Sequence, residues 1–113
     1  MISIYHNNRC SKSRDSLAIL NEKNIDYKVI EYIKTPLTFD ELKALLKKLR
    51  MKPHDLIRKG ESVFKESYKD KILDDDEWIE IMVNNPILIE RPIIVKGNKA
   101  VVGRPPEKVL ELL

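Results

Sequence analysis

The chain of 113 residues contains a single cysteine, Cys10, and this scarcity limits the redox chemistry open to it. One thiol forms no internal disulfide and supplies neither a dithiol motif nor a multi-thiolate zinc site. Any redox function therefore requires a thiol from another molecule. The chain also has only three glycines, too few for a glycine-rich phosphate loop. Its two histidines are His6 and His54, and with one cysteine they predict no bound metal.

A strong excess of charge and a long apolar run are also lacking. Lys and Arg number 21 against 18 Asp and Glu, which gives a formal net charge of +3. Because both signs are interspersed, the composition does not suit nucleic-acid binding by charge alone, and a small anion is the expected partner. No stretch approaches the roughly 18 apolar residues of a membrane span, and no leader pattern opens the chain. We therefore expect a cytoplasmic protein that binds neither nucleic acid nor membranes.

The first third of the chain is predicted to form a strand, a helix and a second strand. A short apolar run at 2–5 ends at the polar cluster His6-Asn7-Asn8, which indicates a strand followed by a loop. A helix is expected at roughly 12–23, ending at Asn24, and β-branched and aromatic residues at 27–33 predict another strand. Such a crossover connection predicts a parallel pair of strands.

The remaining elements predict an α/β domain. Residues of about 37–85 show helical spacing and form a helical insertion, with Thr38 expected to cap its first helix. Gly97-Asn98 between two β-branched runs predicts a hairpin, and a last helix is expected with Val109, Leu110, Leu112 and Leu113 along one apolar side. The order βαβ, helices, ββα predicts one thioredoxin-like domain over residues 1–113, with a mixed sheet and the insertion between its halves. Such folds keep a cis X-Pro bond where this chain has Arg91-Pro92, although the sequence does not assign the isomer.

Cys10 lies in the expected loop between the first strand and the first helix. A thiolate at this position meets unpaired backbone N–H groups and the positive end of the helix dipole. These donors, with Arg9, Lys12 and Arg14 nearby, predict a pKa below the ordinary value of about 8.5. Because the same features bind oxyanions, the loop predicts a nucleophilic thiolate beside an anion site. The alternative is an inert, buried cysteine, which charged neighbours seldom flank.

Three more arginines stand in distinctive contexts. Arg58 follows a predicted helical turn, while Arg91 and Arg104 each precede a proline. Guanidinium presents a planar fork to a tetrahedral oxyanion, which lysine does not. Taken singly, each arginine is best interpreted as part of a surface salt bridge. Taken together with Cys10, they predict an oxyanion site.

Four motifs, in order along the chain, carry a family resemblance: His6-x3-Cys10-x3-Arg14 and residues 56–59, 85–93 and 103–105. They resemble the glutaredoxin-coupled arsenate reductase family (ArsC type), which also contains Spx-type transcriptional regulators. The resemblance implies a thioredoxin-like fold and an arsenate reductase that detoxifies arsenic.

The resemblance also implies roles for individual residues. Cys10 would attack the arsenic of bound arsenate and form a thiolate–arsenic adduct. Arg58, Arg91 and Arg104 would bind the oxyanion and stabilise the adduct, while His6 and Arg14 would tune the thiolate or its loop. No cofactor would be bound: glutathione would act as co-substrate and glutaredoxin would supply the second reducing equivalent, so that arsenite leaves.

Two other functions remain open from the sequence. The first is an Spx-like regulator that binds RNA polymerase, although the redox-switching members carry a Cys-x-x-Cys motif and this chain has Ser13 at the second position. The second is an ArsC-like thiol protein that acts on another substrate, such as a glutathione mixed disulfide. The dependence of turnover on the arginines would distinguish these functions from arsenate reduction.

Overall fold

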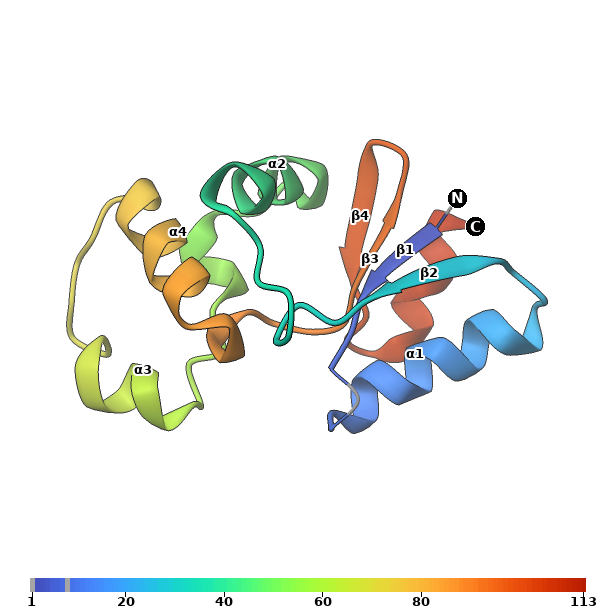
Figure 1. Cartoon of the computed structure of the whole chain (residues 1–113), viewed down its shortest axis with the longest axis horizontal. Coiled ribbons are helices and arrows are strands. Elements are labelled where there is room, and N and C mark those ends of the chain that lie inside the picture. The colour runs from blue at the N-terminus through green and yellow to red at the C-terminus, as the bar shows by residue number, and fades with distance from the viewer. Residues whose placement is uncertain (1, 8) are drawn as a thin grey trace. The chain divides into compact units, whose positions relative to one another are not determined.

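A computed structural model describes residues 2–7 and 9–113 of the chain, so that Asn8 of the predicted loop lies outside the described residues. The chain divides into two compact units. The first combines Met1–Thr35 with Arg91–Leu113, and the second is the continuous segment Pro36–Glu90 (Figure 1). The second unit thus contains the helical insertion expected at about 37–85, and it extends to Glu90 at its end. That the whole chain behaves as one domain remains a prediction.

The first unit is built on a four-stranded mixed sheet with the order β2-β1-β3-β4. The strands are β1 (Ile2–Tyr5), β2 (Tyr27–Ile30), β3 (Ile93–Lys96) and β4 (Lys99–Val102). Strands β1 and β2 pair in parallel and are joined by the helix α1 (Ser11–Glu22), while β1–β3 and β3–β4 are antiparallel. The α/β fold, the parallel pair and the mixed sheet predicted from the sequence are confirmed.

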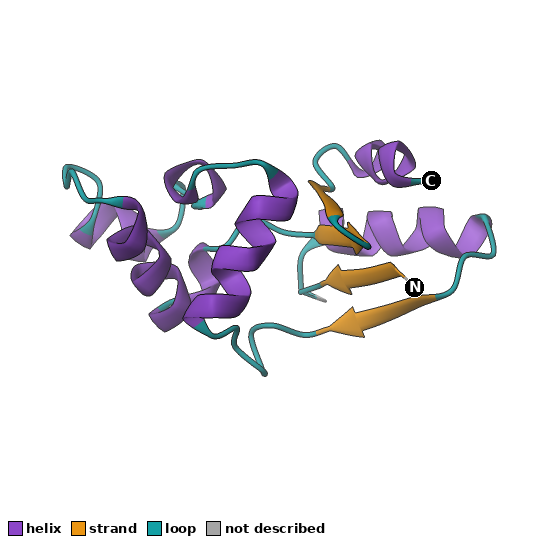
Figure 2. Cartoon of the chain, turned by 90° about the horizontal axis from the view of Figure 1, so that it is seen from above, coloured by secondary structure: helices purple, strands orange, loops and turns teal. Residues whose placement is uncertain are grey.

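The core of this unit lies between the sheet and two helices on one of its faces (Figure 2). Ile2 and Ile4 alternate with half-buried residues along β1, as expected for a strand with one covered face. They pack with Leu20 of α1, Ile94 of β3 and Val109 of η3 (Pro106–Leu112). Each such side chain contributes about 1.5–3 kcal/mol when it is removed from water, so this cluster fixes α1 against the sheet.

The last helix differs from the prediction, because η3 is a 3-10 helix instead of an α-helix. Its buried residues Pro106, Val109 and Leu112 recur every three positions, and in a 3-10 helix such residues lie on one line. Leu110 and Leu113, which the sequence placed on the same apolar side, are instead 43% and 45% exposed. The strand expected at 27–33 is also shorter and ends at Ile30.

The second unit is helical. It contains α2 (Phe39–Leu49), η1 (Pro53–Leu56), α3 (Ser62–Ser67), α4 (Asp75–Asn84) and η2 (Pro86–Leu88). Reciprocal capping boxes fix where α2 and α4 begin: the side chain of Thr38 accepts from the N–H of Glu41, and that of Asp74 accepts from the N–H of Glu77. The buried Leu42, Leu45 and Leu46 form the apolar side of α2, in agreement with the helical spacing expected at about 37–85.

Candidate active site

Cys10 is the residue immediately before the first turn of α1, and its backbone is extended (φ −99°, ψ 121°). Its N–H donates to the carbonyl of Asn7 at 2.9 Å, and its own carbonyl accepts from the N–H of Arg14 at 3.2 Å. These two bonds fix the loop to the start of the helix. The half-buried thiol therefore lies where the first N–H groups of α1 have no partner within the helix.

Two arginines reach this thiol. Arg104 donates from Nη2 to Cys10 Sγ at 3.4 Å and from Nε to the carbonyl oxygen of Arg91 at 2.7 Å. The buried side chain of Arg91 is also hydrogen-bonded to the sulfur of Cys10. Both arginines precede prolines in cis, at Arg91-Pro92 and Arg104-Pro105. The structure thus brings together three of the predicted site residues, and two guanidinium groups meet at one sulfur atom.

The environment of Cys10 lowers the pKa of its thiol to about 7. Burial of the thiol acts in the opposite direction and raises the pKa, because a buried charge loses hydration. Hydrogen bonds from the backbone of Ser13, the side chain of Arg91 and the backbone of Lys12 outweigh that effect, and the charge of Arg104 adds to them. The outcome is a large thiolate fraction at neutral pH. The donors that stabilise this anion are also suited to an oxyanion.

Two small residues that the sequence did not assign to the site hold this arrangement together. Gly103, directly before Arg104, donates its N–H to the carbonyl of Pro92 at 2.8 Å. A Cβ atom at Gly103 would lie 2.7 Å from Ser16 Oγ on α1 and 2.9 Å from Pro92 Cγ. The glycine therefore allows the end of β4 to approach the helix that carries Cys10. The only signal in the sequence is a glycine directly before a candidate arginine, in a chain that has few glycines.

His6 follows β1 directly, and its side chain is buried, with 5% exposed. Its backbone N–H donates to the carbonyl of Ile30 at 2.9 Å. The ring atom Nδ1 has no hydrogen-bond partner among the described residues. Burial lowers the pKa of His6, the carboxylate of Glu31 opposes this change, and the charge of Arg14 adds to it. His6 is therefore neutral at pH 7. The exposed Arg14 acts on this histidine electrostatically, and the roles of both residues toward the thiolate remain predictions.

Arg58 belongs to the second unit, where a β-bridge between Ile57 and Ile89 holds the surrounding backbone. Its side chain donates from Nε to Glu61 at 3.2 Å and lies 3.6 Å from Glu90 through Nη1. Arg58 therefore forms the kind of salt bridge that the sequence indicates for each arginine taken singly. Its participation in the chemistry of Cys10 remains a prediction.

Within residues 2–7 and 9–113, no group of three or more His, Cys, Asp or Glu side chains is arranged to hold a metal ion. In the same part of the chain, no helix combines the length and the apolar character needed to cross a bilayer.

Known proteins resemble this chain over almost its whole length. The ArsC family profile matches residues 5–112. The chain is 45% identical to the uncharacterized protein YfgD of Escherichia coli (strain K12), and the match covers 99% of this chain and 96% of YfgD. It is 39% identical to an arsenate reductase of Neisseria meningitidis serogroup A, covering 99% and 97% of the two chains.

Solved structures also resemble this chain over almost its whole length. A structure described as arsenate reductase from Vibrio cholerae superimposes with a TM-score of 0.94 at 43% identity, covering 99% of this chain and 97% of that one. Sequence and fold therefore agree with the motifs from which the site was built, and the chain belongs to the ArsC family.

Proposed function

We propose that this protein reduces arsenate to arsenite, with glutathione as co-substrate and glutaredoxin as the second reductant. The observation that carries the proposal is the convergence of Arg91 and Arg104 on the sulfur of Cys10. An inert cysteine needs no such donors, whereas a nucleophile for an oxyanion needs both a thiolate and a positively charged site. Membership of the ArsC family and the relatives named arsenate reductase support the same reaction.

The first step is attack of the Cys10 thiolate on arsenic(V). A sulfur–arsenic bond forms, one arsenic–oxygen bond breaks, and the departing hydroxyl takes a proton and leaves as water. Arg91 and Arg104 hold the remaining oxygens, because their N–H groups are already directed at the sulfur to which arsenic becomes bound. Arg58 is proposed to add a third guanidinium group to the oxyanion, and His6 and Arg14 to tune the thiolate.

Two external thiols then supply two electrons. Glutathione condenses with the adduct and releases a second water, so that arsenic carries the sulfur atoms of Cys10 and of glutathione. A glutaredoxin thiolate attacks the glutathione sulfur, the arsenic–sulfur bond breaks, and its electron pair reduces arsenic(V) to arsenic(III). The products are a glutathione–glutaredoxin mixed disulfide and, after water cleaves the bond to Cys10, arsenite. Because the reaction consumes reduced thiols, we place it in the cytoplasm.

A coupled assay tests the proposal. NADPH oxidation is followed with glutathione reductase, glutathione, glutaredoxin and arsenate, and each component is omitted in turn. We expect turnover that requires arsenate and glutaredoxin and that Cys10→Ser abolishes. If the wild-type protein consumes no NADPH in response to arsenate, the proposal is wrong. Turnover of a glutathione mixed disulfide without arsenate turnover would instead identify a thiol protein with another substrate.

A further inference from the structure

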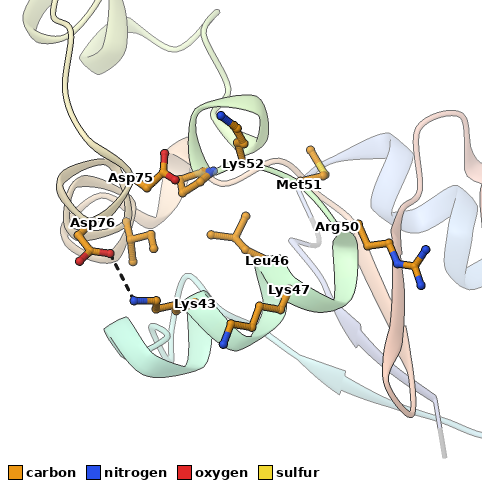
Figure 3. Close-up of a pocket in the computed structure, with 10 residues that line it drawn as sticks. Lys43, Leu46, Lys47, Arg50, Met51, Lys52, Asp75 and Asp76 are labelled. Atoms are coloured by element: carbon orange, nitrogen blue, oxygen red, sulfur yellow. Dashed lines mark ion pairs between the residues drawn. The ribbon is translucent and has the colours of Figure 1, made fainter.

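A groove lies between α2 and α4 in the second unit (Figure 3). The residues that line it do not include the candidate active-site residues. It encloses about 430 Å³. Its apolar lining consists of Leu46 and Ile79, both almost fully buried, with Pro53 and the half-buried Met51. Figure 3 shows the Leu46 side chain directed into the groove. The cavity is large enough for an aliphatic side chain of another molecule.

The rim of this groove is mainly positive. Four cationic side chains line it, those of Lys43, Lys47, Arg50 and Lys52, together with the carboxylates of Asp75 and Asp76. Lys43 reaches across the groove to Asp76 at 3.5 Å, so these two charges compensate each other (Figure 3). Within the described part of the chain, no ion pair engages the other three cations. Asp75 adds one negative charge, so the groove presents a net positive charge beside an apolar cavity.

Stabilisation of α2 accounts for only part of this charge. Lys47 lies in the last turn of α2, where a cation favours the helix dipole. Lys52 lies beyond the end of the helix. Arg50 is the C-cap residue and adopts the left-handed conformation (φ 56°, ψ 41°), for which glycine is the usual residue. Glycine would adopt this conformation without strain, although the charge of Arg50, like that of Lys47, favours the helix dipole.

We infer that this groove binds an acidic peptide segment of a partner protein. One aliphatic side chain of the peptide occupies the cavity beside Leu46, and flanking carboxylates pair with Lys47, Arg50 and Lys52. Charge complementarity around an apolar centre is the arrangement found at specific protein interfaces. Single-stranded nucleic acid is less suited to the site, because such ligands stack on aromatic side chains and none of the described residues lining the groove is aromatic.

The test uses the full-length protein and a fluorescein-labelled peptide, Asp-Glu-Asp-Leu-Asp-Glu-Asp. Fluorescence anisotropy is expected to give a Kd on the order of 100 μM or tighter at low salt. Binding should weaken at least fivefold in 0.5 M salt, and a peptide with serine in place of leucine should bind at least fivefold more weakly. These two results separate the contributions of charge and of the apolar cavity.

Variants locate the binding site. Lys47→Glu and Arg50→Gly are each expected to weaken binding at least fivefold. Arg50→Gly should at the same time raise the melting temperature, because glycine adopts the left-handed conformation without strain. A loss of binding in that variant therefore cannot result from unfolding. The matched control is Lys28→Glu on β2, an exposed residue of the first unit that makes the same charge change and should leave binding unaltered.

Three results would overturn the inference. The first is the absence of peptide binding at millimolar protein. The second is an equal loss of affinity in Lys28→Glu and Lys47→Glu, which would indicate only a long-range effect of net charge. The third is equally tight binding of an oligothymidylate of the same charge, together with no effect of the serine substitution, which would indicate a general polyanion site. None of these measurements depends on arsenate turnover.

Discussion

Gly103 lies against Ser16, and this contact ties the strand end that carries Arg104 to the helix that carries Cys10. A Cβ atom at position 103 would lie 2.7 Å from Ser16 Oγ, closer than side-chain atoms normally approach. The residues next to this contact, Arg104 and Pro92, belong to the segments that direct guanidinium groups at the thiol. The arrangement of the guanidinium groups around Cys10 therefore depends on a steric fit between two residues that carry no charge.

Gly103→Ala is expected to disturb both stability and the thiolate. The added methyl group forces α1 or the segment at 103–104 to move, at a cost of about 1–3 kcal/mol for overpacking. The movement lengthens the bond from Arg104 to Cys10 and so raises the pKa of the thiol. Urea unfolding measures the first effect, and the pH dependence of alkylation by iodoacetamide measures the second.

Two further variants control this prediction. Gly60→Ala introduces the same methyl group where no heavy atom lies within 4 Å and should change neither quantity. Ser16→Ala in combination with Gly103→Ala should restore part of the loss, because it removes the closest atom. The Oγ of Ser16 has no hydrogen-bond partner among the described residues, so its removal costs little. Identical behaviour of the Gly103 and Gly60 variants would contradict the proposed fit.

The alkylation of Cys10 should follow a thiolate with a pKa of about 7. The rate with iodoacetamide should be half-maximal near pH 7 and still measurable at pH 6, because only the thiolate reacts. The unfolded chain has the higher pKa, so this thiolate stabilises the fold at alkaline pH, and the contribution is lost as pH falls through 7. Reaction that begins only above pH 8 would show that the donors do not stabilise the thiolate.

Arg104→Lys should impair arsenate turnover although the charge is retained. The guanidinium group of Arg104 uses two nitrogens at once, one for the carbonyl of Arg91 and one for Cys10 Sγ, and an ammonium group does not reproduce this planar arrangement. We expect kcat/KM to fall by about 100- to 1,000-fold, the range seen when a donor to a developing oxyanion is removed. The control is Arg9→Lys, an exposed arginine of the same loop. Equal losses in both variants would mean that the fork geometry of Arg104 has no special role.

Much of the fold follows from local signals in the sequence. The caps at Thr38 and Asp74 and the β-branched runs around Gly97 define elements from within a few residues, and the structure contains those elements. The last helix could not be assigned correctly, because its apolar residues fit either a three- or a four-residue period and only packing on the sheet selects the former. This choice depends on tertiary contacts that a local pattern does not contain.

The candidate site likewise contains residues that local sequence signals identify and residues that only tertiary contacts reveal. Cys10 could be identified because a lone cysteine between a strand and a helix is a local signal, and Arg91 and Arg104 because prolines follow them. The contact between Gly103 and Ser16 could not, because it joins residues far apart in the sequence whose types are common in any protein. Nor could the pairing of Arg58 with Glu90 be predicted, because Glu90 is distant in the sequence and the bridge between Ile57 and Ile89 brings the two segments together.

His6 provides a last prediction, on stability in acid. Burial lowers the pKa of this histidine below its ordinary value of 6.5, so the unfolded chain binds a proton at a pH where the folded chain does not. The neutral histidine therefore stabilises the fold above pH 6.5, and this contribution is lost as pH falls through the lowered pKa. NMR titration should show that His6 protonates below pH 6.5, and urea unfolding of His6→Gln should lose less stability between pH 7 and pH 5 than the wild type. A titration midpoint above 6.5 would instead mean that the carboxylate of Glu31 outweighs burial and that His6 carries a charge beside the Cys10 loop.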